Sequence, residues 1–378
     1  MAKKFRVGVI FGGQSGEHEV SIRSAASVIQ AIDRKKYDVL PIAISREGKW
    51  LSPAEALTLL PPAAQSLLSQ EQISTKTDEV AILGDPSRQG LLALDQKGQS
   101  DVATPLDVVF PVLHGPFGED GTLQGLLEMA NVPYVGCGVL ASSCGMDKVA
   151  MKLLFLQAGL PMCKYVWFLR SHWQNDPKKV TNKVERELGY PCFVKPANLG
   201  SSVGVSKATD KASLKKAIDL AAQYDRKIVV EEAVDAREIE CAVLGNDEPR
   251  ASLPGEYVIH DNSAGFLDYT EKYNATGHVD FVVPAPISQA LTARIQRMAV
   301  RAFQSVDAAG LARVDFFLKR DTKELLINEL NTLPGLTEVS GYPKMWTASG
   351  LTYTQMLDAL IQLAFERHKE KSLNKATL

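Results

Sequence analysis

The first 44 residues constrain the fold more than any other part of the chain. Phe5–Phe11 is a compact apolar run that ends in a glycine-rich turn, and Tyr37–Ile44 is a second apolar run of strand length. Between them, apolar residues recur at the three- and four-residue spacing of a helix that packs on a sheet. Strand, helix and strand in this order are the unit of a parallel sheet, so the sequence predicts an α/β protein. The glycine turn then lies at the carboxyl end of a strand, where open α/β sheets bind ligands.

Length and composition limit the class of protein. The chain has 378 residues, enough for two or three domains. It has neither an apolar run near the ~20 residues of a membrane span nor the pattern of a secretory signal at its start. A net charge of −2 without a long basic run argues against nucleic acid as a partner. Five scattered cysteines, with no Cys-x-x-Cys pair, argue against a disulfide framework or a zinc cluster. We therefore expect a cytoplasmic protein with no nucleic-acid or membrane partner.

Polar side chains project from two neighbouring segments, residues 313–319 and 325–331, that otherwise have the composition of buried strands. Because side chains on a strand alternate between its faces, each strand presents two polar residues on one face. These are Arg313, Asp315, Glu329 and Asn331. A solvated sheet face would explain any one of them. Together they predict a metal and phosphate site with an anion-stabilising arginine, because Mg²⁺ prefers oxygen ligands and substrate phosphates. Gly335 follows and can bring a backbone N–H close to a reacting oxygen.

Further candidate residues lie where predicted strands end or helices begin. Glu17 begins the first helix, a position typical of a carboxylate favoured by the helix dipole and also suited to holding an ammonium group. His114 follows a buried strand at 106–113 and precedes a second glycine-rich turn, and a structural or a functional role is open. Lys148 lies in the first turn of the amphipathic helix expected at 147–158. Cations are less favoured there, which indicates an anionic partner.

A glycine- and serine-rich loop follows the buried strand that ends near Lys195. It contains Ser201 and Ser202, whose hydroxyls, together with the backbone N–H groups of the loop, can wrap phosphates. A plain hairpin turn is the alternative interpretation. The segment does not have the GxxxxGK[ST] pattern, which disfavours a Walker-type ATPase.

Two later segments complete the predicted site. Two strands joined by the linker Val234–Glu238 are typical of a slot for adenine, with Glu238 placed to reach the ribose hydroxyls. Ile259–Asp280 shows no clear period, and a long irregular loop in a compact domain is often an active-site lid. Residues 45–104, polar and rich in Gln, Ser and Pro, are expected to be surface excursions.

Several motifs from about residue 5 to residue 350 then point to one family. They are VIFGGQSGEHEVS, HGPFGEDGTLQG, MDKVAMK, FVKPANLGSSVGVSK, VEEAVDAREIECAVLG, DYTEKY, ARVDFFL and INELNTLPGLTEVSGYPK. Together they resemble the D-alanine–D-alanine ligase family, which has the ATP-grasp fold. The resemblance implies an amino-terminal parallel α/β domain at 1–136 and a central ATP-grasp domain at 137–231. It implies a carboxy-terminal ATP-grasp domain at 232–378 that carries the lid at about 259–280.

The resemblance also implies an activity. ATP drives the joining of two D-alanine molecules through an acyl phosphate, with release of ADP and phosphate, for peptidoglycan precursor synthesis. The metal ligands, for a pair of Mg²⁺ or Mn²⁺ ions, would be Asp315, Glu329 and Asn331. The ATP-binding residues would be Lys148, Lys195, Ser202, Glu231, Glu232, Val234 and Glu238. Adenine would contact the backbone near Glu232 and Val234, and no role is assigned to the side chain of Glu232. The family also implies a homodimer formed through the amino-terminal domain.

The substrate roles that the resemblance implies fall into two groups. The catalytic residues would be Glu17, Ser201, Tyr273, Arg313, Gly335 and Ser340. Among them, Glu17 would bind the ammonium group of the first D-alanine and form a hydrogen-bonded trio with Ser201 and Tyr273. Arg313 and the Gly335 N–H would stabilise the tetrahedral oxyanion. The substrate-binding residues would be His114 near the first D-alanine, with Ser340 and Lys272 on the carboxylate of the second.

Three alternatives differ from this interpretation. A ligase that makes D-alanyl-D-lactate would share nearly all of these residues, but the triplet Glu271–Tyr273 resembles that of the dipeptide-forming enzymes. A non-catalytic nucleotide-binding protein on the same scaffold would have lost a metal ligand or the arginine, yet every one of these positions is filled. Other ATP-grasp ligases would share the nucleotide-binding half alone.

Overall fold

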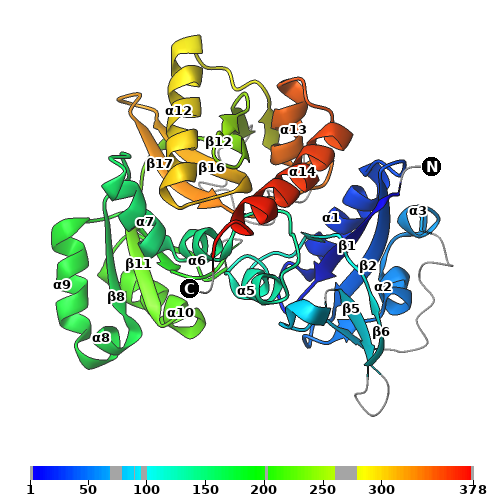
Figure 1. The fold of residues 1–378 in the computed structure, drawn as a ribbon. Coiled ribbons are helices and arrows are strands. Elements are labelled where there is room, and N and C mark those ends of the chain that lie inside the picture. Colours follow the sequence, from blue (N-terminus) through cyan, green and yellow to red (C-terminus); the bar gives the residue numbers. More distant parts are fainter. Residues whose placement is uncertain are drawn as a thin grey trace.

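The computed structural model describes residues 3–68, 79–88, 90–94, 100–200, 203–259 and 279–375. Figure 1 shows three lobes, each built on its own β-sheet. The first sheet contains strands β1–β7, the second β8–β11 and the third β12–β17. The domain boundaries given above remain predictions.

The amino-terminal sheet has the strand order β6-β5-β4-β3-β2-β1-β7. Its strands are β1 (Phe5–Gly12), β2 (Tyr37–Ile44), β3 (Trp50–Leu51), β4 (Glu79–Ala81), β5 (Leu91–Leu94), β6 (Ser100–Thr104) and β7 (Val108–Pro111). Its helices are α1 (His18–Ala31), α2 (Pro53–Leu59), α3 (Pro62–Gln65) and α5 (Thr122–Met129), with a 3-10 turn at Pro86–Arg88. The predicted strand–helix–strand unit is confirmed, because β1 pairs in parallel with β2 and with β7.

Two expectations for this lobe were wrong. The described parts of 45–104 are not all surface excursions, because β3, β4, β5 and β6 extend the sheet by antiparallel pairing. The sheet is therefore mixed and not parallel throughout. These strands have only two to five residues, too few to show an alternating period. Beyond β7, a single parallel bridge joins Tyr134 to Val109.

The central sheet is antiparallel and has the order β10-β9-β11-β8. Its strands are β8 (Tyr165–Leu169), β9 (Cys192–Pro196), β10 (Ser206–Ala208) and β11 (Lys227–Glu232). The helices of this part of the chain are α6 (Val139–Met146), α7 (Lys148–Gln157), α8 (Arg170–Asn175), α9 (Pro177–Glu187) and α10 (Lys211–Tyr224).

Helix α7 joins the central sheet to the third one. Its first turn is capped by Asp147, whose side chain accepts hydrogen bonds from the backbone of Val149 and Ala150. Val149 packs against the central sheet. Met151 and Phe155, on the same helix, lie in the core beneath β16 and β17. Helix α7 therefore packs against both sheets. Lys148, in its first turn, lies where the two sheets meet.

The third sheet has the order β15-β14-β12-β16-β17, with β13 paired to β12. Its strands are β12 (Ala236–Gly245), β13 (Arg250–Ala251), β14 (Gly255–Ile259), β15 (Val279–Val282), β16 (Gly310–Lys319) and β17 (Leu325–Asn331). Its helices are α12 (Gln289–Ser305), α13 (Gly341–Ala348) and α14 (Tyr353–Lys371). The two strands predicted at 313–319 and 325–331 are confirmed and pair as the hairpin of β16 and β17, although β16 begins earlier than expected. Because β12 begins at Ala236, the adenine linker is shorter than predicted, and the lid residues 260–278 lie outside the described residues.

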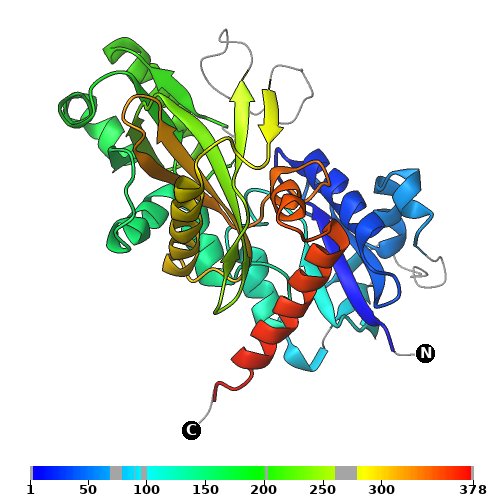
Figure 2. The same ribbon diagram turned by 90° about the horizontal axis from the view of Figure 1, so that it is seen from above.

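The carboxy-terminal helix α14 packs against the first sheet and against the third (Figures 1 and 2). Leu357 and Leu360 of this helix are fully buried in one core with Val7 and Val108 of the first sheet. Each buried leucine contributes about 1.5–3 kcal/mol. The hydroxyl of Tyr37 also donates a 2.6 Å hydrogen bond to Asp358. The helix thus holds the amino-terminal lobe against the sheet that carries the polar hairpin.

Candidate active site

The four polar residues predicted from the hairpin lie together in the structure. The strand register places Arg313 opposite Asn331 and Asp315 opposite Glu329. Arg313 donates two hydrogen bonds of 2.7 Å to Asp315, and Asn331 Nδ2 donates one of 3.1 Å to the same carboxylate. The ladder has a β-bulge next to Asp315. Bulges of this kind re-aim side chains beside functional sites.

A third acidic residue, which the sequence analysis missed, completes this row. Glu240 on β12 lies opposite Asp315, is 2% exposed, and its Oε1 is 3.1 Å from Arg313 Nε. Burial alone would lower the pKa of Arg313, but Asp315 and Glu240 hold it well above its ordinary value. The guanidinium is therefore a fixed positive charge between two carboxylates.

The donor set on β16 and β17 fits a magnesium site. Within the described ranges, no group of three His, Cys, Asp or Glu side chains could hold a metal by itself. Asp315, Glu329 and Asn331 offer two carboxylates and one amide oxygen from adjacent strands. Mg²⁺ is usually held by one or two carboxylates together with substrate phosphates. The protein therefore needs to supply only some of the metal ligands.

A buried cluster of lysines lies on the central lobe. Glu231 is 3% exposed, and its carboxylate accepts a 2.7 Å hydrogen bond from Lys195 and lies 2.9 Å from Lys152 Nζ. Burial would raise the pKa of Glu231, but the charges of Lys152 and Lys195 lower it below its ordinary value. The structure therefore places Glu231 where it orients Lys195. Lys152 was missed, although its spacing of four from Lys148 puts both on one helix face.

Lys148 reaches from α7 toward the third sheet. Its Nζ donates a 2.7 Å hydrogen bond to the carbonyl of Leu199, in the loop after β9. Burial lowers the pKa of Lys148. The largest effect that raises it is the negative charge of Glu329 on β17. Burial would also lower the pKa of Lys195, but Glu231 and then Glu329 raise it. The two lysines and the proposed metal ligand Glu329 are thus electrostatic neighbours.

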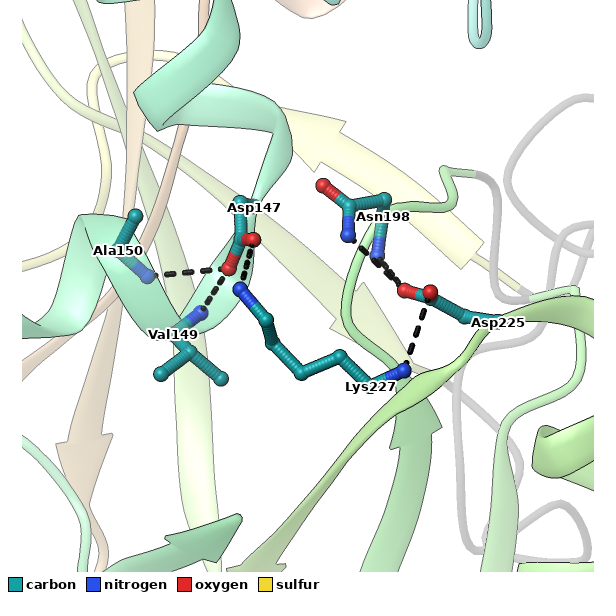
Figure 3. A network of polar contacts seen from close by, with 6 residues as sticks. All are labelled: Asp147, Val149, Ala150, Asn198, Asp225 and Lys227. Atoms are coloured by element: carbon teal, nitrogen blue, oxygen red, sulfur yellow. Dashed lines mark hydrogen bonds and ion pairs between the residues drawn. The ribbon is translucent and has the colours of Figure 1, made fainter. Parts of the chain in front are cut away.

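A polar network anchors the start of the glycine- and serine-rich loop (Figure 3). Asp225 accepts hydrogen bonds from the backbone N–H of Asn198 at 2.8 Å, from its side-chain amide at 2.9 Å, and from the backbone of Lys227 at 3.1 Å. The ammonium group of Lys227 is paired with Asp147, the cap of α7. Through these contacts the helix that carries Lys148 and the loop that leads to Ser201 share one support.

The amino-terminal lobe contributes a pair of carboxylates beside a buried histidine. Glu17 is the residue before α1, and its side chain makes no capping hydrogen bond. A Cβ atom added to Gly200 would lie 3.6 Å from Glu17 Oε2 and 3.8 Å from Glu119 Oε1. His114 is 6% exposed, and burial lowers its pKa against the raising effect of Glu17. Glu119 was also missed by the sequence analysis.

Gly335 and Ser340 lie close together after β17. A Cβ atom on Gly335 would be 3.1 Å from Ser340 Oγ, which is itself 2.6 Å from Thr337 Oγ1. A Cβ atom on Gly341 would be only 2.7 Å from Glu240 Oε2. The turn that carries Ser340 is therefore packed against the carboxylate that holds Arg313.

The predicted adenine segment connects the second sheet to the third. Glu232 Oε1 accepts a 2.7 Å hydrogen bond from the backbone of Lys164, so its carboxylate is already engaged. Val234 lies between the end of β11 and the start of β12, and Glu238 lies on β12 opposite Phe317. The remaining predicted site residues lie outside the described part of the chain: Ser201, Ser202, Lys272 and Tyr273.

Lysines on helix α7 and on strand β9 therefore lie near oxygen donors on the third sheet, and the amino-terminal lobe adds carboxylates and a histidine. This is the arrangement of an ATP-grasp carboxylate ligase. Two family models match the chain, "D-ala D-ala ligase N-terminus" over residues 6–137 and "D-ala D-ala ligase C-terminus" over residues 154–362. The chain belongs to the D-alanine–D-alanine ligase family.

Individual relatives agree over nearly the whole chain. The D-alanine–D-alanine ligase of Heliobacterium modesticaldum is 49% identical, covering 98% of this chain and 97% of the relative. That of Bacillus velezensis is 48% identical, covering 97% and 100%. Among solved structures, the D-alanine-D-alanine ligase of Coxiella burnetii has a TM-score of 0.81 at 35% identity, covering 98% and 97%. The VanG D-Ala:D-Ser ligase of Enterococcus faecalis has a TM-score of 0.82 at 37% identity, covering 96% and 100%.

Proposed function

We propose that the protein joins two D-alanine molecules at the expense of ATP, releasing D-alanyl-D-alanine, ADP and phosphate. The observation that carries the proposal is the position of Arg313. Its guanidinium forms ion pairs with Glu240 and with Asp315, which is one of the proposed metal ligands. Its charge also acts on His114 and Glu119 on the substrate side. One cation thus lies where phosphate, metal and amino acid would meet.

The first step is phosphoryl transfer, for which a protein supplies mainly position and charge. A carboxylate oxygen of D-alanine attacks the γ-phosphorus, ADP leaves, and an acyl phosphate forms. Lys148 and Lys195 would hold the phosphates, supported by Glu231. Mg²⁺ on Asp315, Glu329 and Asn331 would neutralise charge on the phosphates when bound.

The second step is attack by the amine of the second D-alanine on the acyl carbon. The carbonyl oxygen becomes an oxyanion, and the phosphate then leaves with the electrons of the C–O bond. Arg313 and the Gly335 N–H are proposed as the donors to this oxyanion. Ser340, which lies beside Gly335 and directly before Gly341, is proposed to help hold the second carboxylate.

The acyl phosphate can be tested with D-alanine labelled with ¹⁸O in its carboxylate. One carboxylate oxygen departs with the phosphate in the second step. We therefore expect one ¹⁸O atom in each released phosphate, measured by mass spectrometry or by the isotope shift in the phosphorus NMR spectrum. Unlabelled phosphate would contradict a route through an acyl phosphate.

D-Lactate as second substrate is not favoured, because the curated relatives above are named D-alanine–D-alanine ligases. The neighbour named a D-Ala:D-Ser ligase makes D-serine a useful comparison substrate.

We also infer that the protein is cytoplasmic and that it forms a homodimer. Light scattering of the purified protein tests the homodimer. Among the described residues, no helix combines the length and the apolar character needed to cross a membrane.

Asp225→Ala is expected to raise KM for ATP roughly tenfold with a smaller change in kcat. The carboxylate accepts two N–H groups of Asn198, at the start of the proposed phosphate-binding loop, and the backbone N–H of Lys227 on β11. One lost hydrogen bond to a charged group is worth about 1.5 kcal/mol, which corresponds to a factor of about ten. Asp176→Ala is the matched control, because Asp176 likewise accepts a backbone N–H as the cap of α9. It should lower stability and leave KM for ATP unchanged; an equal rise in both variants would refute the positioning role.

A further inference from the structure

The turn after β7 places a second carboxylate beside the one proposed for the substrate ammonium group. Glu119 lies between β7 and α5, and its Oε1 accepts a 2.9 Å hydrogen bond from the backbone N–H of Gly115. This is a short reach back across its own turn, so the carboxylate is held in place. Glu119 has no role in the phosphoryl transfer or in the oxyanion stabilisation proposed above.

Glu119 and Glu17 come from different elements but face one shared point. Oxygens of both carboxylates would contact the same Cβ atom if Gly200 carried one, at 3.8 Å and 3.6 Å. Glu17 Oε2 would likewise be 3.9 Å from a Cβ atom on Gly115. Because Gly200 has no side chain, the point that both carboxylates border is free of one, whereas a Cβ atom on Gly115 would first meet Ser15 Oγ, at 2.9 Å. The shared point adjoins the glycine- and serine-rich loop.

A buried polar atom nearby points independently to a ligand. His114 precedes Gly115, is 6% exposed, and its Nε2 has no hydrogen-bond partner among the described residues. Buried polar atoms normally have a partner, and an exception indicates a group that arrives from outside. Because burial lowers the pKa of His114, the ring is neutral and does not supply the positive charge that the two carboxylates lack.

We propose that Glu119 is a second carboxylate for the ammonium group of the substrate amino acid, protonated in the free protein and ionised in the complex. This inference rests on the proposed function, because that function supplies the ammonium group. Binding is then an exchange: the ammonium enters between the carboxylates, the proton of Glu119 leaves to solvent, and one positive charge replaces another.

The charges around Glu119 account for the exchange. Burial and the neighbouring charge of Glu17 raise the pKa of Glu119 to about 8, whereas Lys148, Arg313 and the Gly115 N–H act in the opposite direction. At pH 7 roughly nine molecules in ten therefore carry the proton. An opposite charge within a few ångströms lowers the pKa of a carboxyl group by about 1–3 units. Bound ammonium thus ionises Glu119 at neutral pH.

The expected pH dependence follows from linkage. Protons are released on binding wherever the pH lies between the pKa of Glu119 in the complex and its higher pKa in the free protein. In that interval the affinity for D-alanine rises with pH, by up to about tenfold per unit, and it levels off above about pH 8. If Glu119 took no part in binding, its proton would not be released and this rise would be absent.

Calorimetry tests the proposal directly. D-Alanine is titrated at pH 7 into the protein with Mg²⁺ and an ATP analogue that cannot transfer its γ-phosphate, in buffers of different ionisation enthalpy. The buffer dependence of the heat gives the number of protons released, expected between about 0.4 and 0.9 for the one D-alanine that binds beside Glu119. D-Lactate, which has the carboxylate and no ammonium group, should release close to none.

Two variants sharpen the result. Glu119→Gln should abolish proton release and flatten the rise of affinity with pH. Asp120→Asn, in the same turn, removes a carboxylate that accepts the backbone N–H of Phe117, and it should release protons as the unmodified protein does. D-Alanine binding without proton release would overturn the inference and leave the proposed function standing. The absence of any D-alanine binding would contradict both the inference and the proposed function. If a variant does not fold, the comparison of D-alanine with D-lactate on the unmodified protein still tests the inference.

Discussion

Arg313→Ala is expected to lower kcat by about 10²- to 10³-fold and to leave KM for ATP within about threefold. Losing one preorganised donor to a tetrahedral oxyanion typically costs this much turnover. The lysines proposed to bind phosphate lie on other elements and keep their own partners. Steady-state kinetics with ATP and D-alanine varied separately give both constants. Equal losses in turnover and in ATP binding would contradict the oxyanion role.

The same substitution should also destabilise the protein. It leaves Asp315 and Glu240 buried without their common cation, and breaking a buried pair from one side costs about 3–5 kcal/mol. Arg313→Lys separates the two effects, because it keeps the charge and loses the two-pronged donor. We expect Arg313→Lys to recover most of the thermal stability and little of the turnover. Turnover that recovered in step with stability would mean that Arg313 acts through the fold.

Glu231→Gln is expected to destabilise the protein by about 3–5 kcal/mol and to weaken ATP binding. The change leaves Lys152, which is 1% exposed, without its counter-charge and takes from Lys195 the carboxylate to which it donates. Because the two lysines lower the pKa of Glu231, its contribution is complete above the ordinary carboxyl range and is lost as pH falls through the lowered value. The difference from the unmodified protein should therefore persist well into acidic pH. Thermal unfolding with and without an ATP analogue measures both effects.

Glu232→Gln is the matched control for that prediction. Glu232 is the next residue on β11, and its carboxylate accepts one backbone N–H near the surface. We expect a cost below about 1 kcal/mol and an unchanged stabilisation by the ATP analogue. Similar behaviour of the two variants would remove the special role of the buried lysine cluster.

The hairpin was predictable from sequence because its signal is local. Alternation alone places Arg313 and Asp315 on one face, and the strand pairing then brings them opposite Asn331 and Glu329. Lys152 carried a local signal too, a spacing of four from Lys148, which went unused. Such residues can be found by reading helix and strand periods with care.

Glu240 and Glu119 could not be placed from local patterns. Glu240 stands in an apolar strand, and only the sheet order puts β12 next to β16 and its carboxylate beside Arg313. Glu119 becomes significant only when the loop at Gly200, from another lobe, meets the turn after β7. The strands between 45 and 104 were not predicted for a different reason. Strands of two to five residues are too short to show an alternating period. Contacts between distant segments are set by tertiary packing, which a motif does not record.

Phosphate release from ATP and Mg²⁺ is the most direct measurement of the proposed activity. It is followed with D-alanine alone, with D-alanine plus D-lactate or D-serine, and with L-alanine as the control. We predict release with D-alanine alone, equal to the amount of D-alanyl-D-alanine formed, and none with L-alanine. Faster release with D-lactate or D-serine and a mixed product would reassign the second substrate. No release with any of these amino acids would contradict the account.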